Sequence, residues 1–546
     1  MHIEKTILAG VLAVASAAAF GVGARAQQAT VFFQATNNAT ARPLTDQDRA
    51  KLQDPLFKLV LSSRPDATKL ADIEALIQPD PAQRRLFVVH EEIKDPRRSS
   101  SGRPPDRRAV ITFLGENQQI QLGSNVMLSV FFDSEQFSDS PEVEAWAWDD
   151  QNGVYNYYKL DSSGNTTPRL SWKLRATSAN ADRLSASQRD GTCLACHTTG
   201  VPIMKELAFP WNNWHSPRNP ADYLTSEGPA PQRWPVASDA RFTHLASAQE
   251  LEASIKGAIG KFNQRRFSDQ VKTDGQGGFA VQDARRLLRP LFVTTEINLA
   301  SAIQTSGLHP IAPGSHNGPT QRVQVPDSFF LVAGLLSSAN LGITDAAGFK
   351  DKALLEPAEY KALVEGAGLK LRTSRGTLAG DTHFAWFTPE LGFVATDWVN
   401  KLLEQKIISP AFAAAALAVD LENPVFSDRR ASLLDSIPQS FTAVPGAAHP
   451  DALTRDVIAR LESANPAADS AKGEFLALLK NPDPVQEVTA RVIAYKDRIG
   501  QQLGNPATRQ AELQRLFRSL QERRRQFAGD DLFGSLVESP ALLPMP

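Results

Sequence analysis

The sequence of 546 residues contains only two cysteines and four methionines, and it has no excess of charge of either sign. Two cysteines can form at most one disulfide, so a disulfide framework is excluded. A formal net charge of −2 gives no general attraction to nucleic acid or to an anionic membrane. We find no internal repeat at a fixed period. We also find none of the G-x-S-x-G, H-E-x-x-H or Walker signatures of common hydrolases and nucleotide-binding enzymes.

Long apolar runs are also absent once the first residues are passed. Residues 1–26 contain the basic Lys5, a small-residue apolar run from Ile7 to Val22, and a small-x-small pattern at Ala24–Ala26. These features predict a secretory signal peptide, with an uncleaved N-terminal anchor as the alternative. We therefore expect a periplasmic or secreted protein whose mature chain begins near Gln27, with no later segment that spans a membrane.

Both cysteines lie in one short stretch, GTCLACHTTG, which runs from Gly191 to Gly200. Cys193, Cys196 and His197 form a C-x-x-C-H pattern, the attachment signature of c-type haem. Two thiols three residues apart on a helical turn can each form a thioether to one porphyrin, and the next side chain then points its imidazole at the iron. Three other interpretations remain open: a thiol–disulfide oxidoreductase motif, a zinc site and an inert cysteine pair.

Through this motif and the export signal, the chain resembles the bacterial periplasmic c-type cytochromes. The resemblance is confined to these two features. It implies that Cys193 and Cys196 carry one covalent haem c and that His197 is the proximal iron ligand. The turn at Gly200–Pro202 lies at about the right distance to offer a backbone carbonyl to the second nitrogen of the His197 ring, as proximal histidines usually require, and a turn without this bond is the alternative.

The second axial ligand decides the chemistry, because a saturated iron transfers electrons and an open iron admits a substrate. Small cytochromes of this kind supply a methionine well downstream, but this chain has none between Met204 and Met545. The candidates are His309 and His316 in a Gly/Pro-rich loop, His215 in an aromatic stretch, and Met204. An open or water-bound iron is the alternative.

The sequence predicts an α+β protein that is mainly α-helical. Short β-branched and aromatic segments with partial alternation indicate antiparallel strands, and the last third carries helical spacing. Helices are also expected over 248–262 and 283–305. The predicted regions are a signal peptide (1–26), an N-terminal helical region with a Pro/Arg-rich linker (27–108), an antiparallel β unit (109–178), a helical haem c-binding region (179–345) and a C-terminal helical region (346–546).

The predicted function is that of a monohaem c-type cytochrome-like protein that transfers electrons with a redox partner protein. A single-haem carrier domain needs only on the order of 100 residues, so the additional chain requires a reason. One alternative is a periplasmic haem c enzyme of the oxygenase, peroxidase or isomerase type, which would act on a small-molecule substrate with an open distal face. A haem-based sensor or binding protein is the second alternative.

Overall fold

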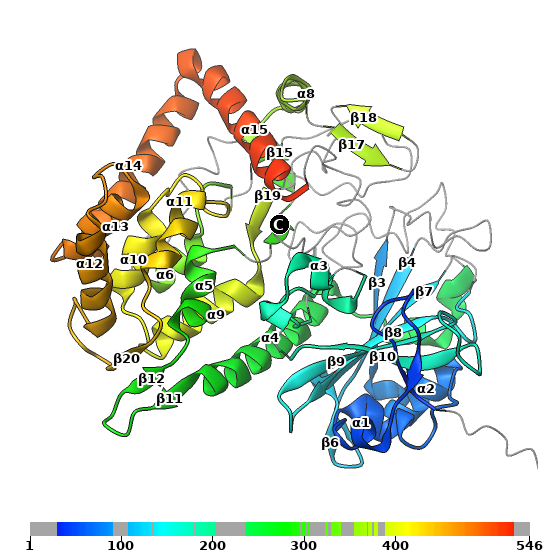
Figure 1. Ribbon diagram of the computed structural model, residues 1–546. Coiled ribbons are helices and arrows are strands. Elements are labelled where there is room, and N and C mark those ends of the chain that lie inside the picture. Colours follow the sequence, from blue (N-terminus) through cyan, green and yellow to red (C-terminus); the bar gives the residue numbers. More distant parts are fainter. Residues whose placement is uncertain are drawn as a thin grey trace, which may run out of the picture.

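The computed structural model of the chain describes residues 30–90, 107–132, 136–179, 181–189, 191–195, 197–202, 235–294, 297–300, 303–304, 323–325, 329–339, 354–368, 370–373, 376–379 and 388–528. The N-terminal half contains an eight-stranded mixed sheet, and a mainly helical region follows it (Figure 1). The fold is therefore a mixture of α and β structure, as predicted at this level.

The large sheet has the strand order β2-β1-β10-β9-β8-β7-β4-β3. Every neighbouring pair is antiparallel except β1 and β10, which are parallel. The strands are β1 (Phe32–Phe33), β2 (Arg42–Pro43), β3 (Arg84–His90), β4 (Arg107–Phe113), β7 (Val126–Phe132), β8 (Val143–Asp149), β9 (Val154–Asp161) and β10 (Ser171–Thr177). A two-stranded hairpin of β5 (Glu116–Asn117) and β6 (Ile120–Gln121) joins β4 to β7.

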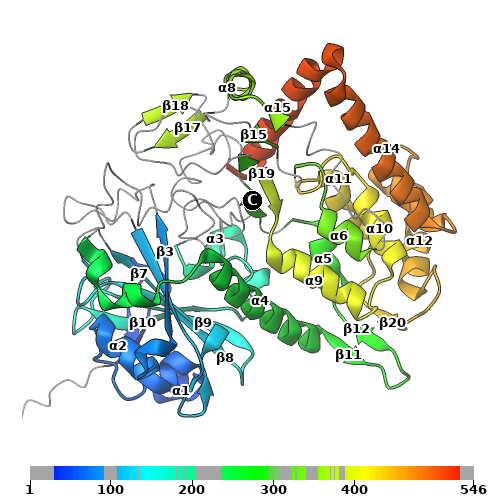
Figure 2. The ribbon, with the colours of Figure 1, turned by 180° about the vertical axis from the view of Figure 1, so that it is seen from behind.

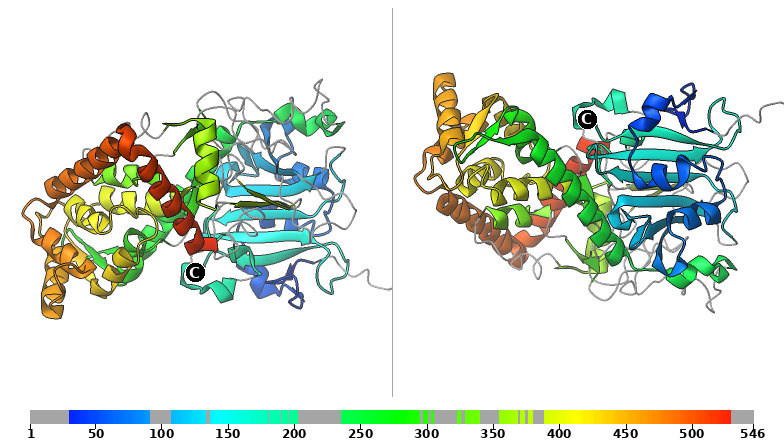
Figure 3. Two further views of the ribbon diagram at one scale, coloured as in Figure 1. Left: turned by 90° about the horizontal axis from the view of Figure 1, so that it is seen from above. Right: turned by 90° about the horizontal axis from the view of Figure 1, so that it is seen from below.

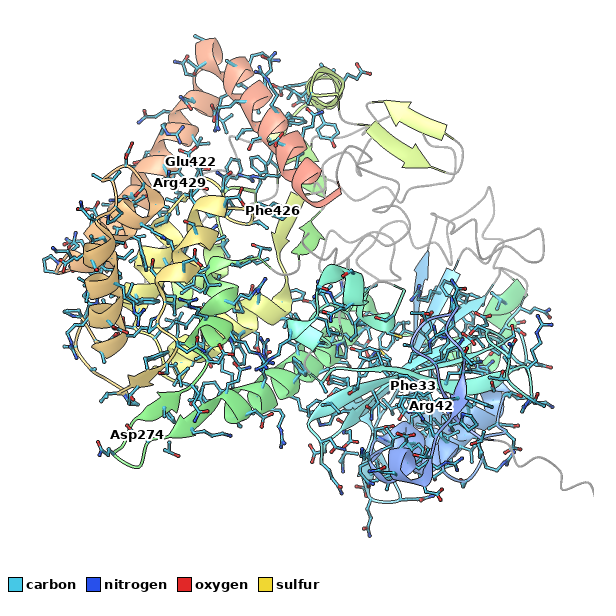
Figure 4. The ribbon with its side chains drawn as sticks, in the orientation of Figure 1. Phe33, Arg42, Asp274, Glu422, Phe426 and Arg429 are labelled. Atoms are coloured by element: carbon cyan, nitrogen blue, oxygen red, sulfur yellow. The ribbon has the colours of Figure 1, made fainter. Side chains whose placement is uncertain are left out.

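Tight turns and edge contacts account for much of the sheet topology. A tight turn joins β8 to β9, with Gly153 at φ 67° and its N–H donating to Asp149 O over 2.7 Å. At the β2 edge, the Arg42 guanidinium lies 5.1 Å from the centre of the Phe33 ring, directly across the β1–β2 pair (Figure 4). Such cross-strand contacts help to stabilise the register of a pair as short as β1–β2.

Alternation along the strands gives the sheet two buried faces. On β8, Trp146 and Trp148 point to one face, and Ala145 and Ala147 to the other. The second face packs on the α2 helix (Leu70–Ile77) and on the buried segment Leu52–Leu61, which follows the short helix α1 (Asp46–Ala50). The first face packs on the long helix α4 (Ala248–Gln270), which leads from the sheet to the helical region (Figure 2).

The C-terminal region is built from helices around the alanine-rich α10, in which Ala411–Ala418 is buried throughout. Seen from above, these helices and the sheet occupy opposite sides of the molecule (Figure 3). The helices beyond α4 are α5 (Ala284–Phe292), α6 (Ala333–Ser338), α8 (Pro357–Gly366), α9 (Phe393–Glu404), α10 (Pro410–Ala418), α11 (Asp428–Ala431), α12 (Ala452–Ala464), α13 (Ala471–Lys480), α14 (Pro484–Gly504) and α15 (Pro506–Ala528).

The helical region also contains several short strands. β12 (Phe279–Val281) pairs with both β11 (Val271–Thr273) and β20 (Phe441–Ala443), and Asp274 begins the turn between β11 and β12 (Figure 4). The remaining pairs are β13 (Ile297–Ala300) with β19 (Thr388–Leu391), β15 (Val323–Gln324) with β14 (Ile303–Gln304) and β16 (Leu354–Leu355), and β17 (Lys370–Thr373) with β18 (Gly376–Ala379).

Two differences from the predicted elements have clear physical reasons. The predicted helix over 283–305 ends at Phe292, because the β-branched Val293 adopts extended angles and a strand, β13, follows. The sheet also extends beyond the predicted β unit of 109–178, since β1, β2 and β3 come from the segment expected to be helical. Among the described residues, none of the helices combines the length and hydrophobicity needed to span a bilayer.

Candidate functional site

The C-x-x-C-H motif follows a short helix, α3 (Ala186–Arg189), and begins with one helical turn. Cys193–Ala195 forms a 3₁₀ turn that Thr192 caps, because its hydroxyl accepts from Leu194 N over 3.0 Å. The His197 N–H then donates to Cys193 O over 3.1 Å. The chain therefore makes one helical turn at Cys193–Ala195.

The His197 ring is partly buried and is held by a backbone carbonyl. Its Nδ1 lies 3.0 Å from Val201 O. A carbonyl oxygen only accepts hydrogen bonds, so Nδ1 must carry the proton in this contact. In the neutral ring the lone pair then lies on Nε2, which is the nitrogen that remains available to a metal. Of the two alternatives for the turn at Gly200–Pro202, the structure shows the one in which the turn supplies a carbonyl to His197.

The turn that presents this carbonyl depends on Gly200. Its φ is +80°, in the region that favours glycine, and its N–H donates to His197 O over 2.8 Å. A Cβ on Gly200 would lie 2.6 Å from the Ser178 Cβ and 2.8 Å from the Ala181 Cβ. The turn is thus pressed closely against the segment that leaves β10, which leaves no room for a side chain.

The motif packs on the sheet face that also receives α4. Leu194 and Val201 are buried in this cluster with the aromatic residues of β8 and β9, and Cys193 is partly buried against it. The Tyr157 ring centre lies 4.8 Å from that of His197, and its buried hydroxyl donates to Gly200 O over 2.9 Å. Strand β9 therefore touches both the imidazole and the turn that orients it.

Burial is the main electrostatic influence on His197 and lowers the pKa of its imidazole, because the charged form loses hydration. The hydrogen bond to Val201 O and the Glu144 carboxylate oppose this shift, and the Arg108 guanidinium adds to it. Glu144 is itself paired with Arg108 at 3.6 Å and with Lys159 at 3.8 Å. The lowered pKa favours the neutral ring, which is the form that binds metals.

The other predicted site residues lie outside the described residues: Cys196, Met204, His215, His309 and His316. Their relation to His197 therefore stays a prediction. Among the described residues, which do not include Cys196, no three His, Cys, Asp or Glu side chains gather as a metal-binding group. The structure thus brings together Cys193, His197 and the Val201 carbonyl.

Sequence reasoning missed Tyr157. Its hydroxyl bonds a residue 43 positions away, so no local spacing connects the two. The available signal is the alternation in β9, where Tyr155 and Tyr157 point to the same face as Trp146 of β8. That alternation indicates an aromatic face but does not identify what the face contacts.

Comparison of the chain with protein-family models, with curated proteins and with solved structures gives no match.

Proposed function

We propose that this chain is an exported monohaem c-type cytochrome-like protein with a redox function. The observation that supports it most directly is the His197 Nδ1 contact with Val201 O at 3.0 Å, in a neutral ring that leaves Nε2 as the metal-binding atom. A partly buried Cys193 on the preceding helical turn is consistent with attachment. The donor set, a thiol and an oriented imidazole, fits haem c.

Under this proposal Cys193 and Cys196 hold the porphyrin, and His197 binds the iron. Haem c, when bound, would supply an iron centre that gains or loses one electron. The protein's own contribution is orientation: the Val201 carbonyl fixes the imidazole tautomer, and the aromatic cluster on the sheet lowers the local polarity. Export of the chain through the segment 1–26 belongs to the same proposal, because haem c is attached outside the cytoplasmic membrane.

The attachment is tested by producing the full chain together with a cytochrome c maturation system. We expect the intact mass to exceed that of the polypeptide by one haem, and haem staining to survive denaturation. C193A and C196A should each weaken the stain, and C193A/C196A should abolish it. An unmodified mass, or a double variant that stains as strongly as the wild type, would refute the proposal.

A second experiment tests whether His197 is the iron ligand. H197A should retain covalent haem but change its absorption spectrum. His449 is the matched control, since its Nε2 also lies near a backbone carbonyl, Leu479 O, at 3.2 Å, but in the helical region. H449A should leave the spectrum unchanged. An unchanged H197A spectrum would remove His197 from the proposal.

The same material separates an electron carrier from an enzyme. A low-spin ferric iron that does not react with cyanide supports electron transfer. A high-spin iron that binds cyanide quickly in the ferric form, or carbon monoxide in the ferrous form, supports the oxygenase, peroxidase or isomerase alternative and contradicts the carrier.

A further inference from the structure

We propose that Tyr157 is a positioning residue that sets the electron-donating strength of His197 by holding the turn that carries its hydrogen-bond acceptor. The predicted effect on the reduction potential of the iron rests on the proposed function. The structural basis of the inference does not depend on any bound group. It depends on the juxtaposition of Tyr157, Gly200 and His197 on one face of the sheet.

Tyr157 reaches the site from a rigid support. It lies in the middle of β9, where it is 3% exposed and paired with Trp146 of β8 and Ala176 of β10. Both neighbouring strands are hydrogen-bonded to β9 along most of its length. The position of the phenol oxygen is therefore set by the sheet and not by a loop.

The hydroxyl orients one peptide unit of the turn. Gly200 O, which accepts from the Tyr157 hydroxyl over 2.9 Å, belongs to the peptide that links Gly200 to Val201. This contact is buried, so water does not readily replace the phenol as donor. Glycine has no Cβ to restrict its backbone angles, so the Gly200 carbonyl is oriented by this hydrogen bond.

The next peptide unit carries the acceptor for His197. Val201 is fully buried, and Pro202 restricts the backbone angles of the residue before it. Once the peptide before Val201 is fixed, little freedom remains for the Val201 carbonyl. Tyr157 thus controls the direction of the 3.0 Å contact between Val201 O and His197 Nδ1, while its ring contacts the imidazole directly.

The chemical consequence follows from this contact. A short, well-aligned Nδ1–H···O bond gives the imidazole more anionic character and makes Nε2 a stronger donor to a metal. Loss of the Tyr157 hydroxyl should loosen the turn, weaken that bond and reduce the donor strength of Nε2. A weaker donor stabilises ferrous over ferric iron, so the reduction potential should rise.

The substitution Y157F removes only the hydroxyl and keeps the ring. Y155F is the matched control: Tyr155 lies two residues away on the same strand, is also buried, and donates to Ala258 O of α4 over 3.2 Å. Both variants lose one buried hydrogen bond, so both should be destabilised to a similar extent. Only Y157F should alter His197.

Two measurements on the full chain test this inference. In the form produced without haem maturation, ¹⁵N chemical shifts at a pH where the ring is neutral should report the Nδ1–H tautomer in the wild type and Y155F, and a mixture of tautomers in Y157F. In the haem-loaded form, Y157F should have a higher reduction potential than the wild type and Y155F.

The outcomes separate this inference from the proposed function. If haem attaches but the tautomer and the potential are the same in Y157F and Y155F, Tyr157 is only a packing residue and the inference is overturned. If no haem attaches, the proposed function fails, but the tautomer measurement still decides the role of Tyr157.

Discussion

The Tyr158 hydroxyl donates a 2.6 Å hydrogen bond to the Asp54 carboxylate in the interior of the protein. Asn156 and the Phe57 N–H donate to the same carboxylate over 2.8 and 2.9 Å. Asp54 is completely buried, and Asp149 adds a nearby negative charge. This cluster fastens the segment before residue 57 to the centre of the sheet, and it makes the stability of that junction dependent on pH.

Burial raises the pKa of Asp54 from 3.8 to about 6, although its three hydrogen-bond donors oppose the shift. The folded state thus binds a proton more tightly than the unfolded state. The stabilisation from this proton is complete below the unfolded pKa and is lost as the pH rises through about 6. Its full size is about 3 kcal/mol.

We therefore expect D54N to flatten the pH dependence of the unfolding free energy. Asparagine lowers the stability at every pH, because its side-chain NH₂ group replaces a carboxylate oxygen and then faces hydrogen-bond donors. The asparagine side chain does not titrate. Urea unfolding at pH 4.5 and pH 7.5 should show the wild type losing more stability than D54N over this interval. Equal losses in the two proteins would contradict the raised pKa.

The substitution Gly200→Ala should damage the site turn. It places a Cβ 2.7 Å from the Ser178 Cα and forces alanine to adopt a φ of +80°. The left-handed conformation alone costs about 1–2 kcal/mol, so a loss of at least about 2 kcal/mol in unfolding free energy is expected.

Gly260→Ala is the control for that experiment. Gly260 lies inside α4, and nothing lies within 4 Å of the place its Cβ would occupy. The same chemical change should raise stability there by about 0.5–1 kcal/mol. Chemical denaturation followed by circular dichroism measures both, and changes of the same sign would argue against the backbone account.

Lys173 supplies a prediction about buried charge. It is fully buried, and its Nζ donates to Asp161 Oδ1 over 2.8 Å and to Asp161 O over 2.6 Å. K173M removes the ammonium group that pairs with the buried Asp161 carboxylate, and it should lower the unfolding free energy by about 3 kcal/mol. The exposed Lys480–Glu462 pair has a similar distance, 2.7 Å. K480M should cost less than about 1 kcal/mol, and similar losses would show that burial is not the deciding factor.

Asn263 provides a test of the junction between α4 and α9. Its side-chain amide is buried and donates to Asp397 Oδ2 over 2.7 Å and to Val394 O over 3.2 Å. N263A should lower the unfolding free energy by about 2 kcal/mol, because both acceptors lose a buried donor. The exposed neighbour Gln264 is the control, and Q264A should change stability by less than about 0.5 kcal/mol. Comparable effects from the two substitutions would contradict a buried junction.

The predictability of the fold followed the range of the interactions involved. Strands β7, β8 and β9 were predictable because their alternation is local, and the last four helices because each carries its own apolar spacing. β1 was not predictable, since it has two residues and pairs in parallel with β10, over 130 positions away. β3 contains the apolar run Leu86–Val89, but its partner β4 follows a polar, proline-rich segment at 94–106, so no hairpin signal connects the two strands.

The candidate site shows the same limit. The C-x-x-C-H pattern could be recognised in the sequence, and a carbonyl near Val201 could be considered as a partner of His197. Both lie within nine residues, over which backbone geometry restricts which groups can come into contact. The contacts of Tyr157 could not be predicted from the sequence, since they arise from the sheet that places β9 against the turn. A motif identifies the chemistry of a site, and tertiary packing determines how that chemistry is tuned.

Helix α4 belongs to two cores. Leu251 and Ile255 are buried against the aromatic face of the sheet with the motif, and Phe267 joins the core of the helical region. A gene fragment cut on either side of this helix would therefore encode a protein with a bare apolar surface. Recombination could not exchange the motif-bearing half for another without also replacing the helix. The two halves are expected to be inherited, and to be lost, together.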